Sequence, residues 1–81
     1  MKYKIEFKPR ATKDLRSINR TDAQKVLAKI RAMENDLTGN VKHLTDFEPQ
    51  YRLRVGDYRV LFDIENDSAI VYRIKHRREA Y

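Results

Sequence analysis

The chain has 81 residues, of which 18 are lysine or arginine, 12 are aspartate or glutamate, and none is cysteine. We expect a single domain spanning 1–81, and the lack of cysteine excludes a disulfide framework, a thiolate nucleophile and a cysteine-ligated zinc site. No apolar run approaches the ~20 residues of a membrane span and no signal peptide opens the chain, so we expect a cytoplasmic protein without a membrane partner. The net charge of +6 suits a polyanionic partner.

The first half of the chain predicts one strand followed by two helices. Apolar and polar residues alternate over 2–7, which is typical of a strand. Pro9 suits the first turn of a helix, and apolar residues at helical spacing predict a short amphipathic helix over 10–18. Thr21 and Gln24 have the spacing of a capping box, so we expect a second helix from there to about Asn35.

The second half predicts most of a sheet. Residues 41–49 show no clear pattern and are interpreted as a connecting loop with a brief extended piece around 42–44. Three alternating runs follow, over 51–55, 58–64 and 69–75, and tight turns at 56–57 and 66–67 join them. The predicted fold is an α+β domain of order β-α-α-β-β-β, in which a helical hairpin packs on a mostly antiparallel four-stranded sheet.

Alternation also separates arginines from apolar side chains in this predicted sheet. Successive residues of a strand point to opposite faces, so Arg52 and Arg54 lie opposite to the apolar set of their run, and Arg59 lies opposite to that of the next. Guanidinium groups match phosphate geometry bidentately, which indicates a nucleic acid as the ligand. The alternative is that these arginines are ordinary polar-face residues, or that Arg59 forms an ion pair with Asp57 or Asp63.

Three segments carry a resemblance to a known family: YRLR at 51–54, GDYRVLF at 56–62 and HRREAY at 76–81. In this order, and with this predicted topology, they resemble the RelE/ParE superfamily of bacterial and archaeal toxins, and within it the RelE branch. The resemblance covers the whole chain. It implies the toxin of a type II toxin–antitoxin system, which enters the ribosomal A site, cuts mRNA there and inhibits translation.

The activity implied by the resemblance is that of a metal-independent endoribonuclease, an mRNA interferase without a cofactor. A ribose 2′-OH attacks the adjacent phosphodiester in line, which gives a 2′,3′-cyclic phosphate and a free 5′-OH. The implied partners are mRNA, the ribosome with its rRNA, and a cognate antitoxin. We expect a monomer when the toxin is free and a hetero-oligomer when the antitoxin is bound.

The resemblance also suggests which residues form the site. Arg59 matches a phosphate-binding arginine of the central strand, and Tyr81 matches a C-terminal tyrosine that stacks on a base or assists proton transfer. Arg77 matches a tail arginine, a role that Lys75 takes if the alignment slips by two residues.

Arg52 and Arg54 stand where family members often carry lysine. An arginine stabilises negative charge but practically never exchanges a proton, so another proton acceptor is needed, and His76 is the expected one. The hypothesis is that Arg54 and Arg59 clamp the phosphate while His76 and Tyr81 handle protons and base stacking. The predicted catalytic residues are Arg54, Arg59, His76, Arg77 and Tyr81, and the predicted RNA-binding residues are Tyr51, Arg52, Lys75 and Arg78.

Two other functions stay open at this point. A ParE-like toxin shares the fold but poisons DNA gyrase and cleaves no RNA, and a non-catalytic module would use its arginines only to bind RNA or protein. The basic pairs, His76 and Tyr81 favour the RelE-type function. The structural alternative for His76 and Tyr81 is a frayed terminus.

Overall fold

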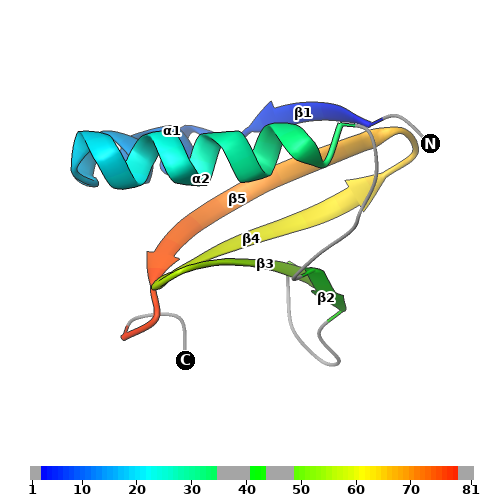
Figure 1. The fold of residues 1–81 in the computed structure, drawn as a ribbon. Coiled ribbons are helices and arrows are strands. Elements are labelled where there is room, and N and C mark those ends of the chain that lie inside the picture. Colours follow the sequence, from blue (N-terminus) through cyan, green and yellow to red (C-terminus); the bar gives the residue numbers. More distant parts are fainter. Residues whose placement is uncertain (1–2, 35–40, 44–48, 79–81) are drawn as a thin grey trace.

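The computed structural model describes residues 3–34, 41–43 and 49–78. These form two helices and five strands in the order β-α-α-β-β-β-β (Figure 1). The helices are α1 (Pro9–Ser17) and α2 (Arg20–Ala32). The strands are β1 (Lys4–Phe7), β2 (Val41–His43), β3 (Tyr51–Val55), β4 (Tyr58–Glu65) and β5 (Ser68–His76). Within these ranges, neither helix is long and apolar enough to cross a membrane.

The strands form one sheet of order β1-β5-β4-β3-β2. β1 pairs with β5 in parallel, and the other neighbouring strands pair antiparallel. The predicted α+β class and the mostly antiparallel sheet are confirmed, but the sheet has five strands rather than four. The additional strand β2 overlaps the brief extended piece expected around 42–44, and it pairs with β3 as a full member of the sheet. A strand of three residues is too short for alternation to reveal it.

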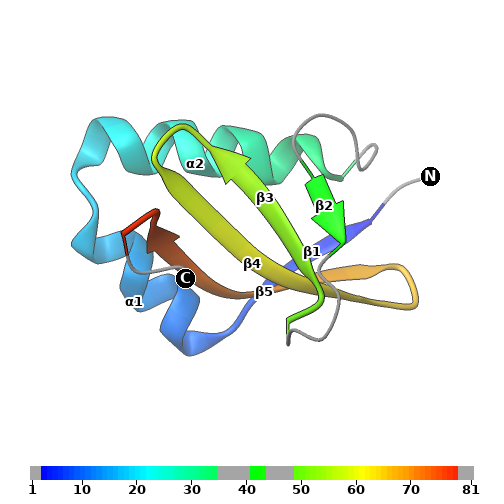
Figure 2. The same ribbon diagram turned by 90° about the horizontal axis from the view of Figure 1, so that it is seen from below.

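Both helices lie on one face of the sheet and bury its apolar side chains (Figure 1). The apolar residues of β3 and β4 face the helices, as alternation predicts, and α2 contributes one stripe of its surface. The largest fully buried side chains are Phe62, Ile30, Met33, Val26, Val60 and Val71. The opposite face, which we call the open face, is covered by no helix of the described residues (Figure 2).

α2 begins before the residue that the capping-box pattern predicts. Its N-cap is Asn19, whose Oδ1 accepts a hydrogen bond of 2.9 Å from the N–H of Asp22. The Nδ2 of Asn19 donates in return to the carboxylate of Asp22 at 2.9 Å. The predicted start at Thr21 is therefore wrong, because Asn19 and Asp22 form the reciprocal pair that was assigned to Thr21 and Gln24. The predicted end near Asn35 lies outside the described residues.

Both predicted hairpin turns are present. The first residue of each has a positive φ, which is 56° at Gly56 and 55° at Asn66. Glycine adopts this conformation without a steric penalty, and asparagine does so more readily than most other residues. The turn chemistry of the sequence therefore fixes where β4 begins and ends.

β5 contains a bulge that the sequence analysis did not predict. Leu61 pairs with Arg73 whereas the next residue, Phe62, pairs with Val71, so Tyr72 is an additional residue on β5. A bulge of this kind shifts the alternation of side chains beyond it. As a result Val71 and Ile74, which are an odd number of residues apart, both lie in the core.

Candidate functional site: a cationic face of the sheet

Basic side chains gather on the open face near the turn between β3 and β4. The register places Arg54 opposite Arg59, and Arg59 opposite Lys75, so these three residues form a row across β3, β4 and β5. We call Arg54, Arg59 and Lys75 the cationic row. The row beside it consists of Lys42, Arg52, Leu61 and Arg73. Since neighbouring strands are about 4.8 Å apart, the cationic row spans about 10 Å of backbone, and its side chains lie within reach of a single phosphate group.

The other end of the open face has a different charge. Beyond the second row, Asp63 pairs with Ile70, which in turn pairs with Glu6. Like charges placed opposite one another on a sheet are destabilising, so fold stability alone would favour mixing these acids with the cations. The separation of charge is incomplete, because Lys4 lies at this end opposite Ser68, whose other neighbour is Glu65, but no acid lies within the two basic rows.

Arg59 is held in place by the turn that precedes it. Its Nη1 donates hydrogen bonds to the carbonyl oxygen of Gly56 at 2.9 Å and to that of Tyr58 at 3.1 Å. These carbonyl oxygens orient the guanidinium group by accepting hydrogen bonds from its N–H groups. The turn therefore fixes the cation at the centre of the row.

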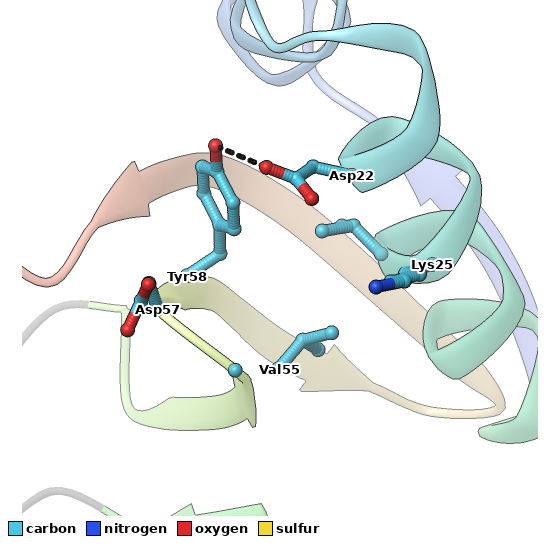
Figure 3. Close-up of a pocket in the computed structure, with 7 residues that line it drawn as sticks. Asp22, Lys25, Val55, Asp57 and Tyr58 are labelled. Carbon is cyan, nitrogen blue, oxygen red and sulfur yellow. Dashed lines mark hydrogen bonds between the residues drawn. The ribbon is translucent and has the colours of Figure 1, made fainter.

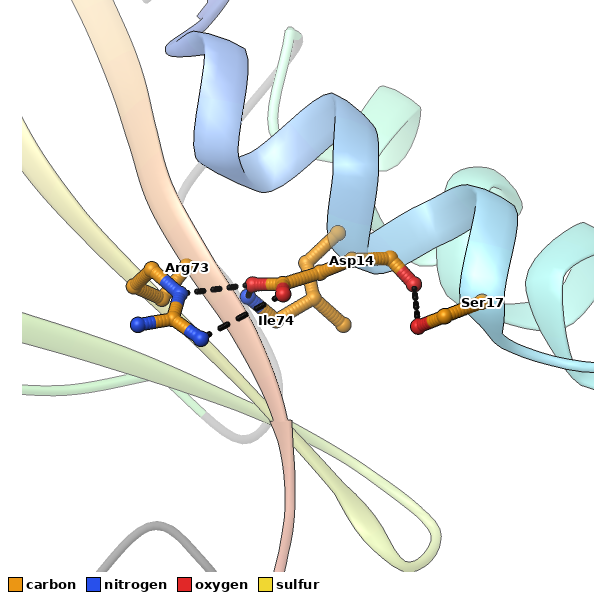
Figure 4. Close-up of polar contacts among 4 residues, drawn as sticks. All are labelled: Asp14, Ser17, Arg73 and Ile74. Atoms are coloured by element: carbon orange, nitrogen blue, oxygen red, sulfur yellow. Dashed lines mark hydrogen bonds and ion pairs between the residues drawn. The ribbon is translucent and has the colours of Figure 1, made fainter.

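Arg73 belongs to the second row, but a carboxylate on α1 neutralises it (Figure 4). Its Nε lies 2.8 Å from Oδ2 of Asp14, and its Nη2 lies 3.3 Å from Oδ1. The same Oδ2 accepts a hydrogen bond of 3.0 Å from the N–H of Ile74. Ile74 lies in the part of β5 that extends beyond the pairing with β1. Burial works to raise the pKa of Asp14, but the hydrogen bonds from Arg73 and Ile74 outweigh it and hold the pKa below its ordinary value.

His76 lies on the side of the sheet that the helices cover. The register pairs it with Tyr58, and the two rings meet edge to face with their centroids 5.5 Å apart. His76 therefore lies on the opposite face from Arg54 and Arg59, which does not support its predicted role as their proton acceptor. The cause is the bulge, because simple alternation from Val71 would place His76 on the open face and Lys75 on the covered one.

Tyr51 also lies on the covered side, away from the cationic row. Its ring stacks on Phe62 at a centroid distance of 5.5 Å, and His43 meets it edge-on at 5.0 Å. This position in the core does not support the RNA-binding role predicted for Tyr51. Arg52, in contrast, lies half-buried in the second row, on the face where alternation places it.

The start of the C-terminal tail is attached to the turn between β3 and β4. The N–H of Arg77 donates to the carbonyl of Asp57 at 2.7 Å, and its Nε lies 3.8 Å from the Asp57 carboxylate. The N–H of Arg78 donates to Nδ1 of His76 at 3.3 Å. Tyr81 lies outside the described residues. Of the predicted site, the structure thus brings Arg54, Arg59 and Lys75 together, and it places Arg77 against Asp57.

A cavity of about 200 Å³ lies between α2 and the same turn (Figure 3). The hydroxyl of Tyr58 donates to the carboxylate of Asp22 at 3.1 Å across one side of it. Burial, together with this hydrogen bond, raises the pKa of Tyr58. These contacts connect the hairpin to α2 and so brace the strands that carry the row. Among the described residues, no group of three or more histidine, aspartate and glutamate side chains is placed to hold a metal ion.

The fold, with two helices on one face of a five-stranded sheet, is that of small toxins that have been solved in complex with their antitoxins. The RelB–RelE complex from Methanococcus jannaschii contains a chain of 25% identity, with a TM-score of 0.78 over 94% of both chains. In the RelBE2 complex from Mycobacterium tuberculosis the identity is 22% and the TM-score 0.82, over 95% of this chain and 100% of that one. In the RelE–RelB complex from Pyrococcus horikoshii OT3 the identity is 23% and the TM-score is 0.79, over 99% of this chain and 100% of that one.

The sequence itself gives the family. The model of the family described as "ParE toxin of type II toxin-antitoxin system, parDE" matches residues 5–81, so the chain belongs to this family of toxins. Toxin RelE3 of Methanocaldococcus jannaschii is 36% identical over 47 residues, which are 58% of this chain and 53% of that protein. The chain thus spans about half the length of this curated relative. The predicted membership of the RelE/ParE superfamily is confirmed.

Proposed function

We propose that this toxin is a ribosome-dependent endoribonuclease that binds mRNA on its open face and cleaves it in the ribosomal A site. The observation that carries the proposal is the cationic row, in which Arg54, Arg59 and Lys75 lie side by side on three strands. In-line attack by a 2′-OH builds negative charge on the phosphorane, and prepositioned cations are the groups that stabilise such charge.

Each member of the row has a chemical role in this proposal. The 2′-oxygen forms a bond to phosphorus as the bond to the 5′-oxygen breaks, a base takes the 2′ proton, and an acid returns a proton to the 5′-oxygen. Arg54 and Arg59 remain charged and stabilise the phosphorane, since a guanidinium practically never gives up its proton. Lys75 carries the amine of the row, and we assign proton transfer to Lys75 rather than to His76, which faces the helices.

The tail supplies secondary contacts in the same proposal. Stacking of a base on Tyr81 and phosphate binding by Arg77 and Arg78 rest on the resemblance to RelE-type toxins. His76 contributes by accepting the N–H of Arg78, which shapes the start of the tail. His76 is thus a positioning residue rather than the proton acceptor.

A cognate antitoxin is the expected protein partner. Three structures with this fold are toxin–antitoxin complexes, which supports an antitoxin that binds this toxin and keeps mRNA from the open face. The free toxin is a cytoplasmic monomer in this proposal, and the inhibited form is a hetero-oligomer.

The proposal is tested with purified toxin, ribosomes programmed with a defined mRNA, and primer extension to map new 5′ ends. Cuts within the A-site codon that require the ribosome are the expected result. A ParE-like function is the second candidate, and the family that matches the sequence favours it. Accumulation of gyrase–DNA cleavage complexes, without any cut in the mRNA, would establish that function and overturn the nuclease.

The assignment of proton transfer to Lys75 has its own test. Lys75→Arg keeps the positive charge of the row but removes the amine. We expect the single-turnover cleavage rate to fall by about 10²–10⁴-fold, the usual contribution of general acid–base catalysis, while binding to the ribosome is kept. A Lys75→Arg variant that cleaves at the rate of the unmodified toxin would exclude Lys75 as the proton acceptor.

A further inference from the structure

α1 carries a second basic surface that the proposed reaction does not use. A hollow of about 360 Å³ is lined by Arg10, Lys13, Asp14 and Ser17 of α1 together with Arg73 of β5. Arg10, Lys13 and Ser17 are spaced three and four residues apart, so they lie on one side of the helix. Figure 2 shows that α1 runs beside the end of β5 and is visible from the side of the open face.

The hollow has a net positive charge. Its one carboxylate, on Asp14, is engaged by the guanidinium of Arg73 and by the N–H of Ile74. In the described part of the chain, ion pairs join Arg73 to Asp14 and Arg77 to Asp57, and neither Arg10 nor Lys13 takes part in one. Both side chains are exposed, so two cations face solvent beside an acid that already has partners.

Arg73, which is paired with Asp14, lies between the hollow and the cationic row. Arg73 lines the hollow and also lies on the open face, two residues before Lys75. At about 3.3 Å per residue of strand, this places the two Cα atoms about 7 Å apart. Basic groups therefore extend from the turn between β3 and β4, across β5, to the flank of α1.

We propose that the hollow beside α1 binds a backbone phosphate of RNA, so that a strand held on the cationic row continues across β5 onto α1. This inference rests on the proposed function, which identifies the ligand as RNA, and adds a second point of contact to it. The lining residues offer charged and polar donors, which suit phosphate oxygens. A protein segment would require apolar anchors, and none lines this hollow.

Equilibrium binding of single-stranded RNA tests the inference. The probe is a labelled oligonucleotide of about 12 nucleotides, long enough to extend beyond the row. The variant is Arg10→Gln with Lys13→Gln, and the control is Lys29→Gln with Arg31→Gln, two exposed cations of α2 whose loss changes the net charge equally. For single strands each phosphate contact contributes about 0.7 to the slope of log affinity against log salt. We expect the slope to flatten by about 0.7 in the hollow variant and to stay unchanged in the control.

A second arm identifies the source of the phosphate. A change seen with free RNA supports the inference that the strand crossing the sheet reaches the hollow. A change seen only with ribosomes assigns the hollow to rRNA and overturns the continuous strand. Equal slopes for the two double variants, with RNA and with ribosomes, would overturn it, as would a defect confined to antitoxin binding. If no cleavage occurs but the slope changes, the proposed function fails while this inference stands. If cleavage occurs but the slope does not change, this inference fails while the proposed function stands.

Discussion

The two faces of the sheet are built from the same strands but have opposite roles. On the covered face β4 contributes Val60 and Phe62, which are fully buried beneath the helices. On the open face the same strand contributes Arg59, between Arg54 and Lys75. The covered face supplies the stability of the domain. The open face can therefore hold cations side by side, although their mutual repulsion is destabilising. A bound phosphate would offset that repulsion.

The difference between the two faces depends on one residue of β5, Tyr72. Before Tyr72 the strand places Val71 in the core, and after it Ile74 is in the core while Lys75 joins the cationic row. A regular strand would place Lys75 on the apolar side. The bulge thus adjusts a single strand to both faces, and bulges are often found beside active sites for this reason.

Inserting one alanine between Arg73 and Ile74 is the change with the largest expected effect. It shifts the alternation of β5 by one residue, so Lys75 would turn toward the core and Ile74 toward solvent. Because burying an unpaired cation costs more than a small domain can lose, we expect no folded protein by circular dichroism and NMR. Deletion of Tyr72 is the matched control, because it removes the bulge but leaves Val71 and Ile74 on the covered face and Lys75 on the open face. An insertion variant as stable as this control would show that the alternation of β5 does not set the two faces.

The bulge also marks the limit of what the sequence predicts. Alternation in β3 and β4 is uninterrupted, so the placement of Arg52, Arg54 and Arg59 on one face could be derived from their spacing. No local pattern marks Tyr72 as additional, because it follows Val71 in an apolar stretch that is compatible with either phase.

Three features of the fold depend on contacts that the sequence shows poorly. β2 exists through its pairing with β3, and its three residues have no strand pattern of their own. The start of α2 is predicted at Thr21 by a capping-box spacing, whereas the hydrogen bonds form between Asn19 and Asp22. Asp14 was not predicted as a partner of Arg73, since they are 59 positions apart and meet only when α1 passes the end of β5.

Asp14→Asn is expected to have an intermediate effect, which depends on pH. The pKa of Asp14 is lower in the folded state than in the unfolded state. The stability that its ionised form contributes is therefore fully present above the unfolded pKa of about 3.9 and is lost as the pH falls through the folded pKa. Near neutral pH we expect a loss of about 1–2 kcal/mol in the free energy of unfolding, because charged hydrogen bonds to Arg73 and Ile74 are weakened.

Urea denaturation at several pH values measures this effect. The difference between the unmodified chain and Asp14→Asn should be constant from pH 8 to about pH 5 and shrink below about pH 4. Asp57→Asn, which alters the exposed pair with Arg77, is the control and should show little dependence on pH. If the difference in free energy of unfolding between the unmodified chain and Asp14→Asn does not shrink at low pH, the role of the ionised carboxylate is refuted.

The smallest effect is expected for Arg77→Ala. Its Nε lies 3.8 Å from the Asp57 carboxylate, and the two side chains are 60% and 63% exposed. Exposed ion pairs of this kind contribute little, and the backbone bond from Arg77 to Asp57 is kept, so we expect a loss below about 0.5 kcal/mol by urea denaturation. A loss equal to that of Asp14→Asn would mean that the tail is part of the stable core.

The most direct test of the account compares two neighbours on β5 that point to opposite faces. Lys75→Gln removes a cation from the open face, and His76→Gln replaces an imidazole on the covered face. In single-turnover cleavage on programmed ribosomes, we predict that Lys75→Gln lowers the rate by at least about 100-fold, as expected when the group that transfers the proton is lost, and that His76→Gln changes it only a few-fold. The reverse result, with His76→Gln inactive and Lys75→Gln as fast as the unmodified toxin, would contradict the assignment of the chemistry to the open face.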